Sequence, residues 1–533
     1  VVFILIVYLT NNASFPRSIF IFEWSLMLIA FWTVRSSRRF SREIINVSTR
    51  SKQRVLIVGA GNAGQSLVVE MLRYPENIYM PIGFIDDDPQ KYKAKISGVK
   101  VFGNRNSIPS VVKDWEVDII IISIPSAKAN VIREILEICN KTEAEIKIIP
   151  SMQEIIAGDV KVSHIREIQI EDLLGRKQIV IDTTEVEYLV RDKIIVITGA
   201  GGSIGSELCC QLIKFKPGKM LLLGHGENSI FKISNKLTEM KTEVELIRII
   251  ADIKDKNIIE KIFSEYKPEI VFHTAAHKHV PLMEENICEA ILNNVYGTKV
   301  LVEMADKYGV EKFINISTDK AVNPISIMGT TKRLAELVVK YFNKFSGTSF
   351  ITVRFGNVIG SRGSVIPIFQ EQIKKGGPVF VTDKEMTRYF MTIPEAVLLV
   401  MQASAIGTGS EIFVLDMGEP IKITDLALNM IKLSGYSEKE IPVIFTGIRN
   451  GEKVHEELFM ETENISHTKH DKILVSYLEI NSETLIQEIN ELIEHSRNFD
   501  FEHIEKVVVK LIPTYTKRFT GIEPDPIKKV IKN

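Results

Sequence analysis

Apolar residues are distributed in two different ways along the chain. The amino-terminal part holds long apolar stretches, at residues 1–8 and, apart from Glu23, at residues 18–34. From residue 54 onward, short runs rich in valine and isoleucine alternate with stretches in which apolar residues recur every three to four positions. This second pattern is typical of alternating strands and helices. The chain therefore divides into an apolar amino-terminal region and a long α/β region.

The second apolar segment is just long enough to cross about 30 Å of hydrocarbon as a helix, whereas residues 1–8 are too short. Arginines follow it at positions 35, 38, 39 and 42, and the positive-inside rule places the chain after such a cluster in the cytoplasm. We therefore expect residues 1–50 to be the end of a truncated, multi-pass anchor in the inner or plasma membrane. A buried hairpin or a signal sequence is the alternative, because Glu23 lowers the hydrophobicity of the segment.

The first part of the α/β region predicts one domain, over residues 52–150. A strand pattern at 55–58 leads into the glycine turn Gly59-Ala60-Gly61-Asn62-Ala63-Gly64 and then into a helical pattern. Such a turn lets backbone amides approach a phosphate. The next strand ends in Asp86-Asp87-Asp88, where a dinucleotide-binding domain carries its ribose-binding carboxylate. We predict a doubly wound, Rossmann-like domain whose ligand the sequence does not identify.

A second doubly wound domain is predicted over residues 191–480, after a linker at 151–190. Its first strand runs into a turn with glycines at 199, 202 and 205, and a wall of small residues follows in the order expected for a nicotinamide dinucleotide. Asp252 is placed to accept a hydrogen bond from an adenine amine. Residues 481–533 are expected to be a helical extension without chemistry. The predicted cofactor-binding residues are Gly199, Gly201, Gly202, Ser203, Ile204, Gly205, Asp252, Ile253, Ala275 and Ala276.

Composition limits the classes of function. The 533 residues carry a formal net charge of −1, which argues against nucleic acid as a partner. Four cysteines, at 139, 209, 210 and 288, have neither the spacing of a zinc site nor the density of a disulfide scaffold, so we expect buried thiols in a reducing compartment. We also predict no metal site, because no carboxylate cluster completes a ligand set around His277 and His279.

The candidate chemistry lies at Thr318-Asp319-Lys320, with Met328 and Lys332 downstream. A Tyr-x-x-x-Lys pair at this spacing would supply a tyrosine as the acid/base group and a lysine that lowers its pKa. Here Met328 holds the tyrosine position, and a thioether cannot exchange a proton. The stretch marks either an inactive relative of an enzyme or an enzyme whose proton chemistry has moved onto neighbouring residues. A helix cap at Thr318 alone would not explain Lys320 or the Met-x-x-x-Lys pattern.

Three long strings outside these motifs carry a family resemblance. They are Ala275-Ala276-His277-Lys278-His279-Val280-Pro281-Leu282-Met283-Glu284, Arg354-Phe355-Gly356-Asn357-Val358-Ile359-Gly360-Ser361-Arg362-Gly363-Ser364-Val365 and Thr387-Arg388-Tyr389-Phe390-Met391. With them, the chain resembles the CapD-like polysaccharide-biosynthesis branch of the extended short-chain dehydrogenases, which includes membrane-bound UDP-N-acetylglucosamine 4,6-dehydratases. Large members of that family also resemble this chain in carrying Met in place of the tyrosine. The resemblance therefore implies an active subgroup.

The resemblance implies an NAD(P)-dependent dehydration of a UDP-sugar to a 4-keto-6-deoxy sugar for capsule, exopolysaccharide, O-antigen or protein glycan synthesis. Thr318 and a water would take the hydroxyl proton at carbon 4, supported by Lys332, which would also hold the nicotinamide ribose. Asp319 would be the acid for the hydroxyl departing from carbon 6. Lys320 would be the base at carbon 5, provided that burial or Lys332 lowers its pKa.

Substrate contacts are expected from a small α+β part at the carboxyl end and from the loop after residue 276. Arg362 is the first candidate for the diphosphate. After the strand at 220–223 the chain reads Gly224-His225-Gly226-Glu227-Asn228, with neither the acidic residue at the strand end that selects NAD nor an arginine for a 2′-phosphate, so a tightly bound NAD or NADP is expected without a choice between them. A homo-oligomer is also left open. The substrate-binding candidates are His277, Lys278, Asn357, Arg362, Ser364, Val365, Arg388, Arg449 and Glu452.

Two alternative functions remain open at this point. A UDP-sugar epimerase on the same scaffold would protonate the ring again without losing water, whereas the pair Asp319 and Lys320 favours dehydration. A membrane-anchored scaffold protein would use both Rossmann-like domains only to sense nucleotides. The sequence leaves inversion or retention at carbon 5 undecided.

Overall fold

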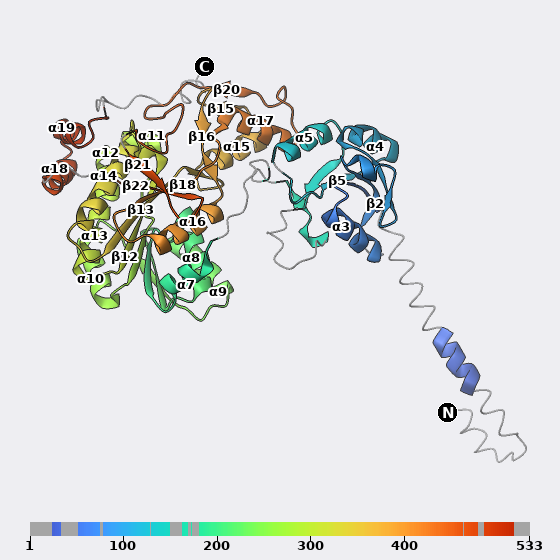
Figure 1. The fold of residues 1–533 in the computed structure, drawn as a ribbon, viewed down its shortest axis with the longest axis horizontal. Coiled ribbons are helices and arrows are strands. Elements are labelled where there is room, and N and C mark those ends of the chain that lie inside the picture. The colour runs from blue at the N-terminus through green and yellow to red at the C-terminus, as the bar shows by residue number, and fades with distance from the viewer. Residues whose placement is uncertain are drawn as a thin grey trace, which may run out of the picture. The chain divides into compact units, whose positions relative to one another are not determined.

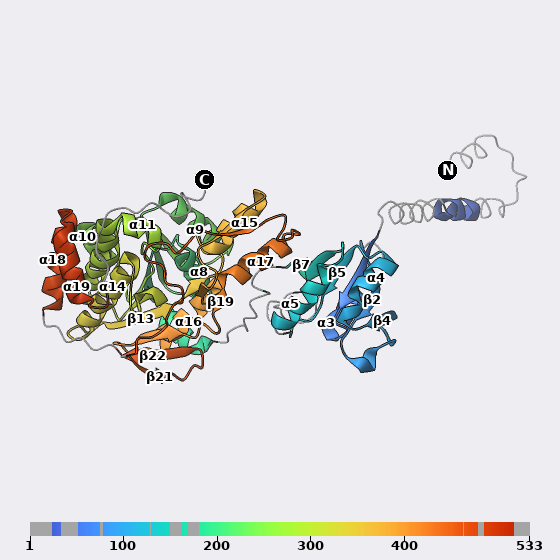
Figure 2. The ribbon, with the colours of Figure 1, turned by 90° about the horizontal axis from the view of Figure 1, so that it is seen from above.

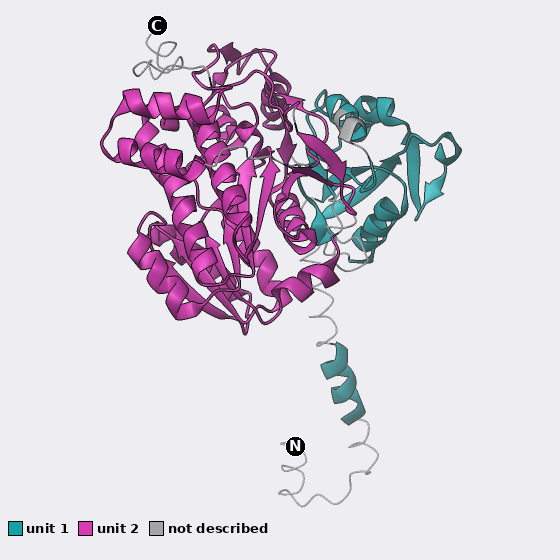
Figure 3. Ribbon diagram, turned by 60° about the vertical axis from the view of Figure 1, so that its left-hand side comes forward, with its two compact units in different colours: residues 1–175 teal, residues 176–533 magenta. Residues whose placement is uncertain are grey.

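The computed structural model describes residues 24–33, 52–74, 78–127, 129–149, 162–168, 172, 181–461, 463–477 and 484–515. They fall into two compact units, Val1–Gly175 and Arg176–Asn533, which Figure 3 colours separately. Several predictions concern residues outside this description, namely the apolar segment 1–8, the arginines at 35, 38, 39 and 42, and most of the tail beyond residue 515.

The structure contradicts the predicted multi-pass membrane location. Within the segment 18–34, the structure describes residues 24–33, and these are helical. Across all the described residues, no helix combines the length and the apolar character needed to cross a bilayer. The prediction relied on the hydrophobicity of 17 consecutive positions, of which the structure describes residues 24–33.

The first unit is a mainly parallel sheet with helices on its faces (Figure 1). The described strands lie in the order β3-β4-β2-β1-β5-β6-β7, with β3 and β7 antiparallel at the two edges. Its elements are β1 (Gln53–Val58), α3 (Asn62–Arg73), β2 (Tyr79–Ile85), β3 (Lys95–Ile96), β4 (Val99–Gly103), α4 (Ile108–Trp115), β5 (Ile119–Ile122), α5 (Ala129–Cys139), β6 (Glu145–Ile148) and β7 (Arg166–Glu167).

The three aspartates after β2 already have partners within this unit. Asp86 Oδ2 accepts hydrogen bonds from the backbone N–H of Ala60, at 2.8 Å, and from Lys91 Nζ, at 3.1 Å. Asp87 accepts from Arg105 Nε at 2.7 Å, and Asp88 caps the short helix that follows. Asp86 therefore ties β2 to the glycine turn, in a position where we expected a carboxylate that binds ribose.

The second unit contains the larger sheet. Among its described strands the order is β10-β9-β8-β11-β12-β13-β18-β22-β21, parallel as far as β18 and antiparallel beyond it. This is the doubly wound order with an antiparallel pair added at one edge. The strands are β8 (Ile194–Thr198), β9 (Lys219–Gly224), β10 (Glu245–Ile250), β11 (Ile270–His273), β12 (Lys312–Thr318), β13 (Ser349–Phe355), β18 (Ile412–Leu415), β21 (Asn464–His467) and β22 (Ile473–Tyr477).

Alternation along the strands divides the core of this unit into two layers. In β8, Ile195 and Ile197 belong to the apolar cluster shared with α7 (Thr183–Val190), α8 (Ser203–Leu212), α9 (Glu227–Glu239) and α16 (Ile393–Ile406). Val196 points to the opposite cluster, shared with α10 (Lys256–Tyr266), α13 (Gly297–Lys307) and α14 (Ile327–Asn343). Both faces of the parallel sheet are thus covered, as its continuous apolar strands require.

The segment predicted as a linker, residues 151–190, supplies elements to both units. β7 completes the first sheet, and α7 begins at the cap Asp182 and buries Val186 and Val190 in the core of the second. Both elements are too short to stand out in a periodicity pattern.

The carboxyl-terminal part combines small two-stranded sheets with helices. Its elements are β14 (Asn357–Val358), α15 (Val365–Lys374), β15 (Val379–Val381), β16 (Thr387–Arg388), β17 (Phe390–Met391), β19 (Ile421–Lys422), α17 (Ile423–Leu433) and β20 (Val443–Phe445). The last described helices, α18 (Leu485–Arg497) and α19 (Phe501–Leu511), lie side by side (Figures 1 and 2). They share an apolar cluster with α11 (Val280–Glu285), α12 (Ile287–Ile291) and α14.

Candidate active site

A cavity of about 300 Å³ lies in the second unit, where the carboxyl ends of β8 and β11 meet. The strand order reverses between these two strands, and open α/β sheets bind their ligands at such a point. Arg362 and His277, two of the substrate candidates, also line it. The predicted cofactor residues that line it are Gly199, Gly201, Gly202, Asp252, Ile253, Ala275 and Ala276.

Other lining residues were missed by sequence reasoning. The turn after β9 contributes the side chain of His225, in a stretch where we looked only for an acidic residue or an arginine. Ser229, in the first turn of α9, lines the same cavity. The sequence did not single it out, because serine is common at helix starts. The complete set of missed lining residues is Gly224, His225, Gly226, Ser229, Ala251, Thr274 and Asn293.

The glycine turn brings backbone amides to the cavity. Gly199 has a φ of +66°, which favours glycine, and a Cβ on Gly205 would lie 2.3 Å from the carbonyl oxygen of Gly199. The close approach lets α8 begin at Ser203, with Gly202 as a cap that offers no side-chain acceptor. The first N–H groups of α8 are therefore available to an anion, which the positive end of the helix dipole also favours.

A buried histidine, His273, connects β8 and β11 through its hydrogen bonds. His273 is 1% exposed, and burial lowers its pKa to about 3. Its Nε2 lies 2.9 Å from the hydroxyl of Thr298, whose proton is given to the Asn294 carbonyl at 2.6 Å. Nε2 must therefore be the protonated nitrogen, and Nδ1 accepts from the Thr198 hydroxyl at 2.8 Å. This neutral imidazole cross-links two strands and the helix α13 beneath the cavity.

The Thr-Asp-Lys stretch forms a tight turn at the end of β12. The Thr318 hydroxyl donates to Asp319 Oδ1 at 2.8 Å, and Lys320 Nζ donates to the same oxygen at 3.0 Å and to Asn357 Oδ1 at 3.1 Å. Asp319 is 1% exposed, and its Oδ2 has no hydrogen-bond partner among the described residues. Because a buried acceptor without a donor is costly, this oxygen is suited to receive a hydroxyl group from a ligand.

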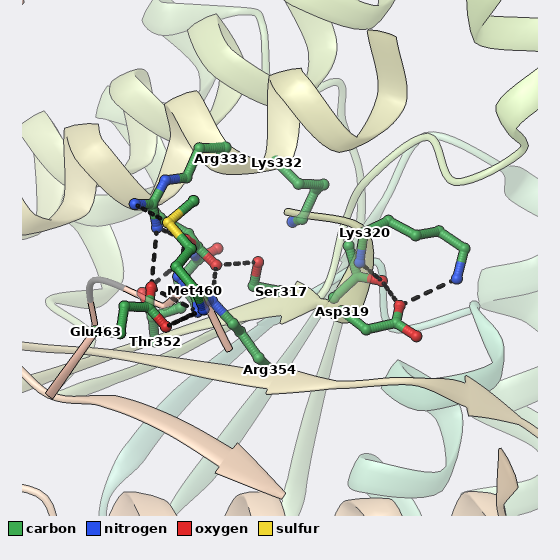
Figure 4. A network of polar contacts seen from close by, with 12 residues as sticks. Ser317, Asp319, Lys320, Lys332, Arg333, Thr352, Arg354, Met460 and Glu463 are labelled. Carbon is green, nitrogen blue, oxygen red and sulfur yellow. Dashed lines mark hydrogen bonds and ion pairs between the residues drawn. The ribbon is translucent and has the colours of Figure 1, made fainter. Parts of the chain in front are cut away.

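The pKa of Lys320 is shifted in the direction opposite to the one that its expected role as a base requires. Burial acts to lower the pKa of Lys320, but the charges of Asp319 and Glu456 outweigh it, and the net shift is upward. Burial lowers the pKa of Lys332 to about 8, with Glu336 opposing it weakly. Lys332 extends from α14 toward β12 (Figure 4) and donates to the Ile316 carbonyl at 2.6 Å. The condition that we set for Lys320 as a base is therefore not met in this structure.

Met328 lies inside the protein rather than among the polar groups of the turn. It is 2% exposed and belongs to the apolar cluster that includes Val280 and Met283 of α11. The position that would carry a tyrosine hydroxyl thus contributes apolar packing at the start of α14.

Three of the substrate candidates come together with Lys320 and the cavity. Lys278 Nζ donates to Ser361 Oγ at 3.2 Å, and the backbone N–H of Arg362 donates to Ser203 Oγ at 3.2 Å. Burial and the charge of Lys320 lower the pKa of Lys278. Asn357 joins the same group through Lys320. Of the remaining candidates, Ser364 occupies the N-cap position of α15 without a side-chain capping bond, Val365 begins the helix, and His277 Nε2 lies 3.1 Å from Glu289.

Two arginines that were candidates for substrate binding contact other groups of the protein. The Arg388 guanidinium donates to the backbone carbonyls of Thr387, Val454 and Lys453, at 2.7, 3.1 and 2.8 Å. Arg449 lies 3.8 Å from Glu452. Arg388 is thus placed to hold the chain around residue 454, and its expected contact to phosphate, ribose or uracil stays a prediction.

A buried ion-pair network supports the strand that carries the turn (Figure 4). Arg354 of β13 is fully buried and donates to both carboxylate oxygens of Glu336, each at 2.7 Å, and to both of Glu463, each at 2.9 Å. Ser317, the residue before Thr318, donates to Glu336 at 2.6 Å, and Arg333 does so at 3.0 Å. Sequence reasoning missed this network because its members are spread from residue 317 to residue 463.

Within the described part of the chain, one group of three side chains has ligand atoms close enough to hold a metal ion. It comprises His495, Asp500 and His503, at the turn between α18 and α19. Asp500 Oδ2 lies 3.1 Å from His495 Nδ1 and 2.8 Å from His503 Nδ1. Two imidazole N–H donors are enough to satisfy this oxygen, so the contacts do not call for an ion. The absence of a metal from the active site stays a prediction.

The strand order, the glycine turn at the switch point and the Thr-Asp-Lys turn together define an extended short-chain dehydrogenase/reductase. The chain belongs to the polysaccharide biosynthesis protein family, whose sequence profile matches residues 195–477. A second profile, described as a CoA-binding domain, matches residues 1–150.

Individual relatives agree with this assignment. The chain is 48% identical to "Probable polysaccharide biosynthesis protein EpsC" of Bacillus subtilis, over 83% of this chain and 74% of that protein. It is 46% identical to the capsular polysaccharide biosynthesis protein CapD of Staphylococcus aureus, over 89% of this chain and 79% of that protein. A UDP-N-acetylglucosamine 4,6-dehydratase (inverting) of Campylobacter jejuni is 34% identical over 50% of this chain and 76% of that protein.

Among solved structures, that of Pen from Bacillus thuringiensis is 31% identical with a TM-score of 0.50. It covers 55% of this chain and 89% of the Pen chain. The predicted family is therefore confirmed, and so is the Rossmann-like fold.

Proposed function

We propose that the protein is a nucleotide-sugar 4,6-dehydratase that acts on a UDP-sugar, with UDP-N-acetylglucosamine as the first candidate, and that its product serves surface polysaccharide or glycan synthesis. The observation that carries the proposal is the turn in which Thr318, Lys320 and the buried Asp319 form one hydrogen-bonded group. This turn ends β12, the strand next to β11, and the residues after β11 line the dinucleotide-type cavity. The relative of C. jejuni that is named as such a dehydratase supports the same reaction.

The residues around the cavity fit a nicotinamide dinucleotide. The uncapped start of α8 faces the turn and suits a pyrophosphate, and Asp252 lies on the wall where an adenine would stack. When bound, NAD or NADP would accept a hydride from carbon 4 of the sugar and give it back at carbon 6. His225, rather than an acidic residue, lines the cavity after β9, so the choice between the two cofactors stays open.

The glycine turn provides a test of cofactor binding. We expect Gly205→Ala to weaken the binding of NAD and NADP by about tenfold or more, or ~1.4 kcal/mol, because its Cβ would meet the Gly199 backbone at 2.3 Å. Calorimetric titration of the folded variant measures this effect. Gly347→Ala is the control, since a Cβ there meets nothing within 4 Å. Unchanged affinity in Gly205→Ala would contradict the assignment of the turn.

The hydrogen bonds of the turn define a path for the first proton. The Thr318 hydroxyl already donates to Asp319. Its oxygen accepts from the backbone N–H of Lys320 at 3.4 Å and has a second lone pair that would accept from the hydroxyl at carbon 4. That proton would pass through Thr318 to Asp319 as the hydride leaves. Asp319 would then give it to the hydroxyl leaving carbon 6, which departs as water. Proton gain and proton loss at Asp319 balance over the cycle.

Lys320 is the candidate base at carbon 5. It is protonated in the resting site, since the charges around it raise its pKa. Protonation of Asp319 would remove one of those charges, and the pKa of Lys320 would fall at the stage when a base is needed. Lys320 would then release its ammonium proton to solvent, act as the neutral amine, and take one proton back from solvent when Asp319 is ionised again. The proton taken from carbon 5 is returned there when the hydride adds at carbon 6, so that the net loss is one water.

The mass of the product tests the proposed reaction. We expect the purified chain, incubated with UDP-N-acetylglucosamine and dinucleotide, to convert the substrate to a species lighter by one water, as measured by mass spectrometry. An unchanged mass with altered stereochemistry would instead indicate an epimerase, an outcome with a basis in the 35% identity to a UDP-glucose 4-epimerase of Rickettsia rickettsii. No conversion of any UDP-sugar would favour a nucleotide-sensing scaffold.

A further inference from the structure

One buried carboxylate beside Lys320 has no assigned role. Glu456 lies on the irregular segment after α17 and is 7% exposed. Its Oε1 is 3.4 Å from Lys320 Nζ and 3.7 Å from Arg388 Nε, while its Oε2 has no hydrogen-bond partner among the described residues. Burying a carboxylate is costly unless nearby charges compensate. The position of Glu456 between two cations is therefore a specific arrangement and not a solvated surface pair.

The segment that carries Glu456 is fastened on both sides of the catalytic turn. Arg388 binds the carbonyls of Lys453 and Val454, and the backbone N–H of Thr387 donates to the Val454 carbonyl at 3.0 Å. Lys453 Nζ donates to the carbonyl of Val322, just after the turn, at 2.9 Å. These bonds fix the distance between Glu456 and Lys320 independently of the ion pair itself.

The charges that face Lys320 come from four directions. Asp319 lies on the turn, Glu456 on the fastened segment, Arg388 on β16 and Lys278 on the loop after β11. Two carboxylates and two other cations thus surround one ammonium group. If Asp319 is neutralised by a proton, Glu456 is the one anion of this set that remains.

We propose that Glu456 is a positioning residue that holds Lys320 against Asn357 and sets the pH at which Lys320 releases its proton. The expected effect on kcat rests on the proposed function. The contact between Glu456 and Lys320 does not, because it is already present in the protein without substrate. The role of Arg388 follows from it: Arg388 acts through Glu456, as the clamp of the segment.

A direct measurement of Lys320 tests the inference without any assumption about the reaction. The full chain is labelled with a small amine-reactive reagent over a pH series, and modification of Lys320 is followed by peptide mass spectrometry. Removing the charge in Glu456→Gln should lower the pKa of Lys320, so its labelling midpoint should move by about 1 pH unit or more to lower pH. Glu457→Gln is the matched control, because Glu457 is half exposed and pairs with Lys453 and Asn323 instead.

Kinetics then separate positioning from mere structural support. In Glu456→Gln, the rise of kcat with pH should move to lower pH, whereas a variant that is only less stable would lose activity equally at every pH. Glu456→Asp, which keeps the charge on a shorter side chain, should bring the labelling midpoint back toward the wild-type value. If the glutamine variant does not fold, the aspartate variant is the test, because moving the carboxylate away from Lys320 should shift the midpoint in the same direction by a smaller amount. An unchanged labelling midpoint in Glu456→Gln, or an equal shift in Glu457→Gln, would overturn the inference. A wild-type chain without dehydratase activity would refute the proposed function alone, since the labelling result still decides the role of Glu456.

Discussion

Replacing Lys320 with methionine is expected to lower kcat by about 10³-fold, the size of a lost acid/base group, while dinucleotide affinity stays within about twofold of wild type. Methionine keeps most of the length of the side chain but cannot exchange a proton. The ammonium of Lys320 contacts Asp319, Asn357 and Glu456 and no residue of the glycine turn. Turnover by mass spectrometry and cofactor titration measure the two effects separately.

A matched lysine separates chemistry from folding in this experiment. Lys340→Met removes another partly buried amine of the same unit, one that donates to the Ser410 carbonyl, and should keep kcat near the wild-type value. Wild-type turnover in Lys320→Met would remove Lys320 from the mechanism and leave the nucleotide-sensing alternative in place.

Replacing Arg354 with leucine is expected to cost about 3–5 kcal/mol in the free energy of unfolding, because it leaves buried carboxylates without their counter-charge. Glu336 and Glu463 would both be affected. Denaturant unfolding of the second unit measures the loss. Arg191→Leu is the control, since Arg191 pairs with Glu187 on the surface and such pairs are worth about 0.3–0.5 kcal/mol.

The same variant should show a characteristic pH dependence. Burial acts to raise the pKa of Glu336, but Arg354, Arg333 and Ser317 outweigh it and hold the pKa below the ordinary 4.5. The stability from this carboxylate is present above pH 4.5 and is lost as the pH falls through its lowered folded value. The difference between wild type and Arg354→Leu should therefore be largest near neutrality and shrink in acid. A difference independent of pH would indicate lost packing instead of lost charge.

The features that the sequence predicted well are encoded in short segments of the chain. The glycine turn at 199–205 is local, because its conformation and its link to α8 are encoded within a few residues, and the structure places most of its predicted partners on one cavity. Neighbouring strands of the parallel sheet were likewise found from short apolar runs. The antiparallel pair β21 and β22 was not predicted, since a strand carries no sign of the direction in which it pairs.

What the sequence could not show depends on contacts between distant residues. Glu456 meets Lys320 only after folding, and nothing around position 456 distinguishes it from its neighbour Glu457. Arg388 was expected to contact the substrate, and its contacts within the protein could not be foreseen because backbone carbonyls have no signature in a sequence. The pKa of Lys320 was expected to fall because only burial and Lys332 were considered, while the charge of Asp319 was left out and the second carboxylate that raises the pKa, Glu456, was unknown. Roles for these site residues remain proposals that the variants above address.

The network around Arg354 also has a consequence for the order in which the chain is made. Arg354 and its partner Glu463 are 109 residues apart in sequence, and Glu463 immediately precedes the added edge strand β21. When β13 has emerged from the ribosome but Glu463 has not, Arg354 therefore has only one of its two carboxylate partners, Glu336. The strand bearing the catalytic turn gains its full support late in synthesis, because domains acquire their packing as the chain emerges from the amino end. A shortened chain that ends before residue 463 would contain the whole Thr-Asp-Lys turn and still lack the group that steadies it.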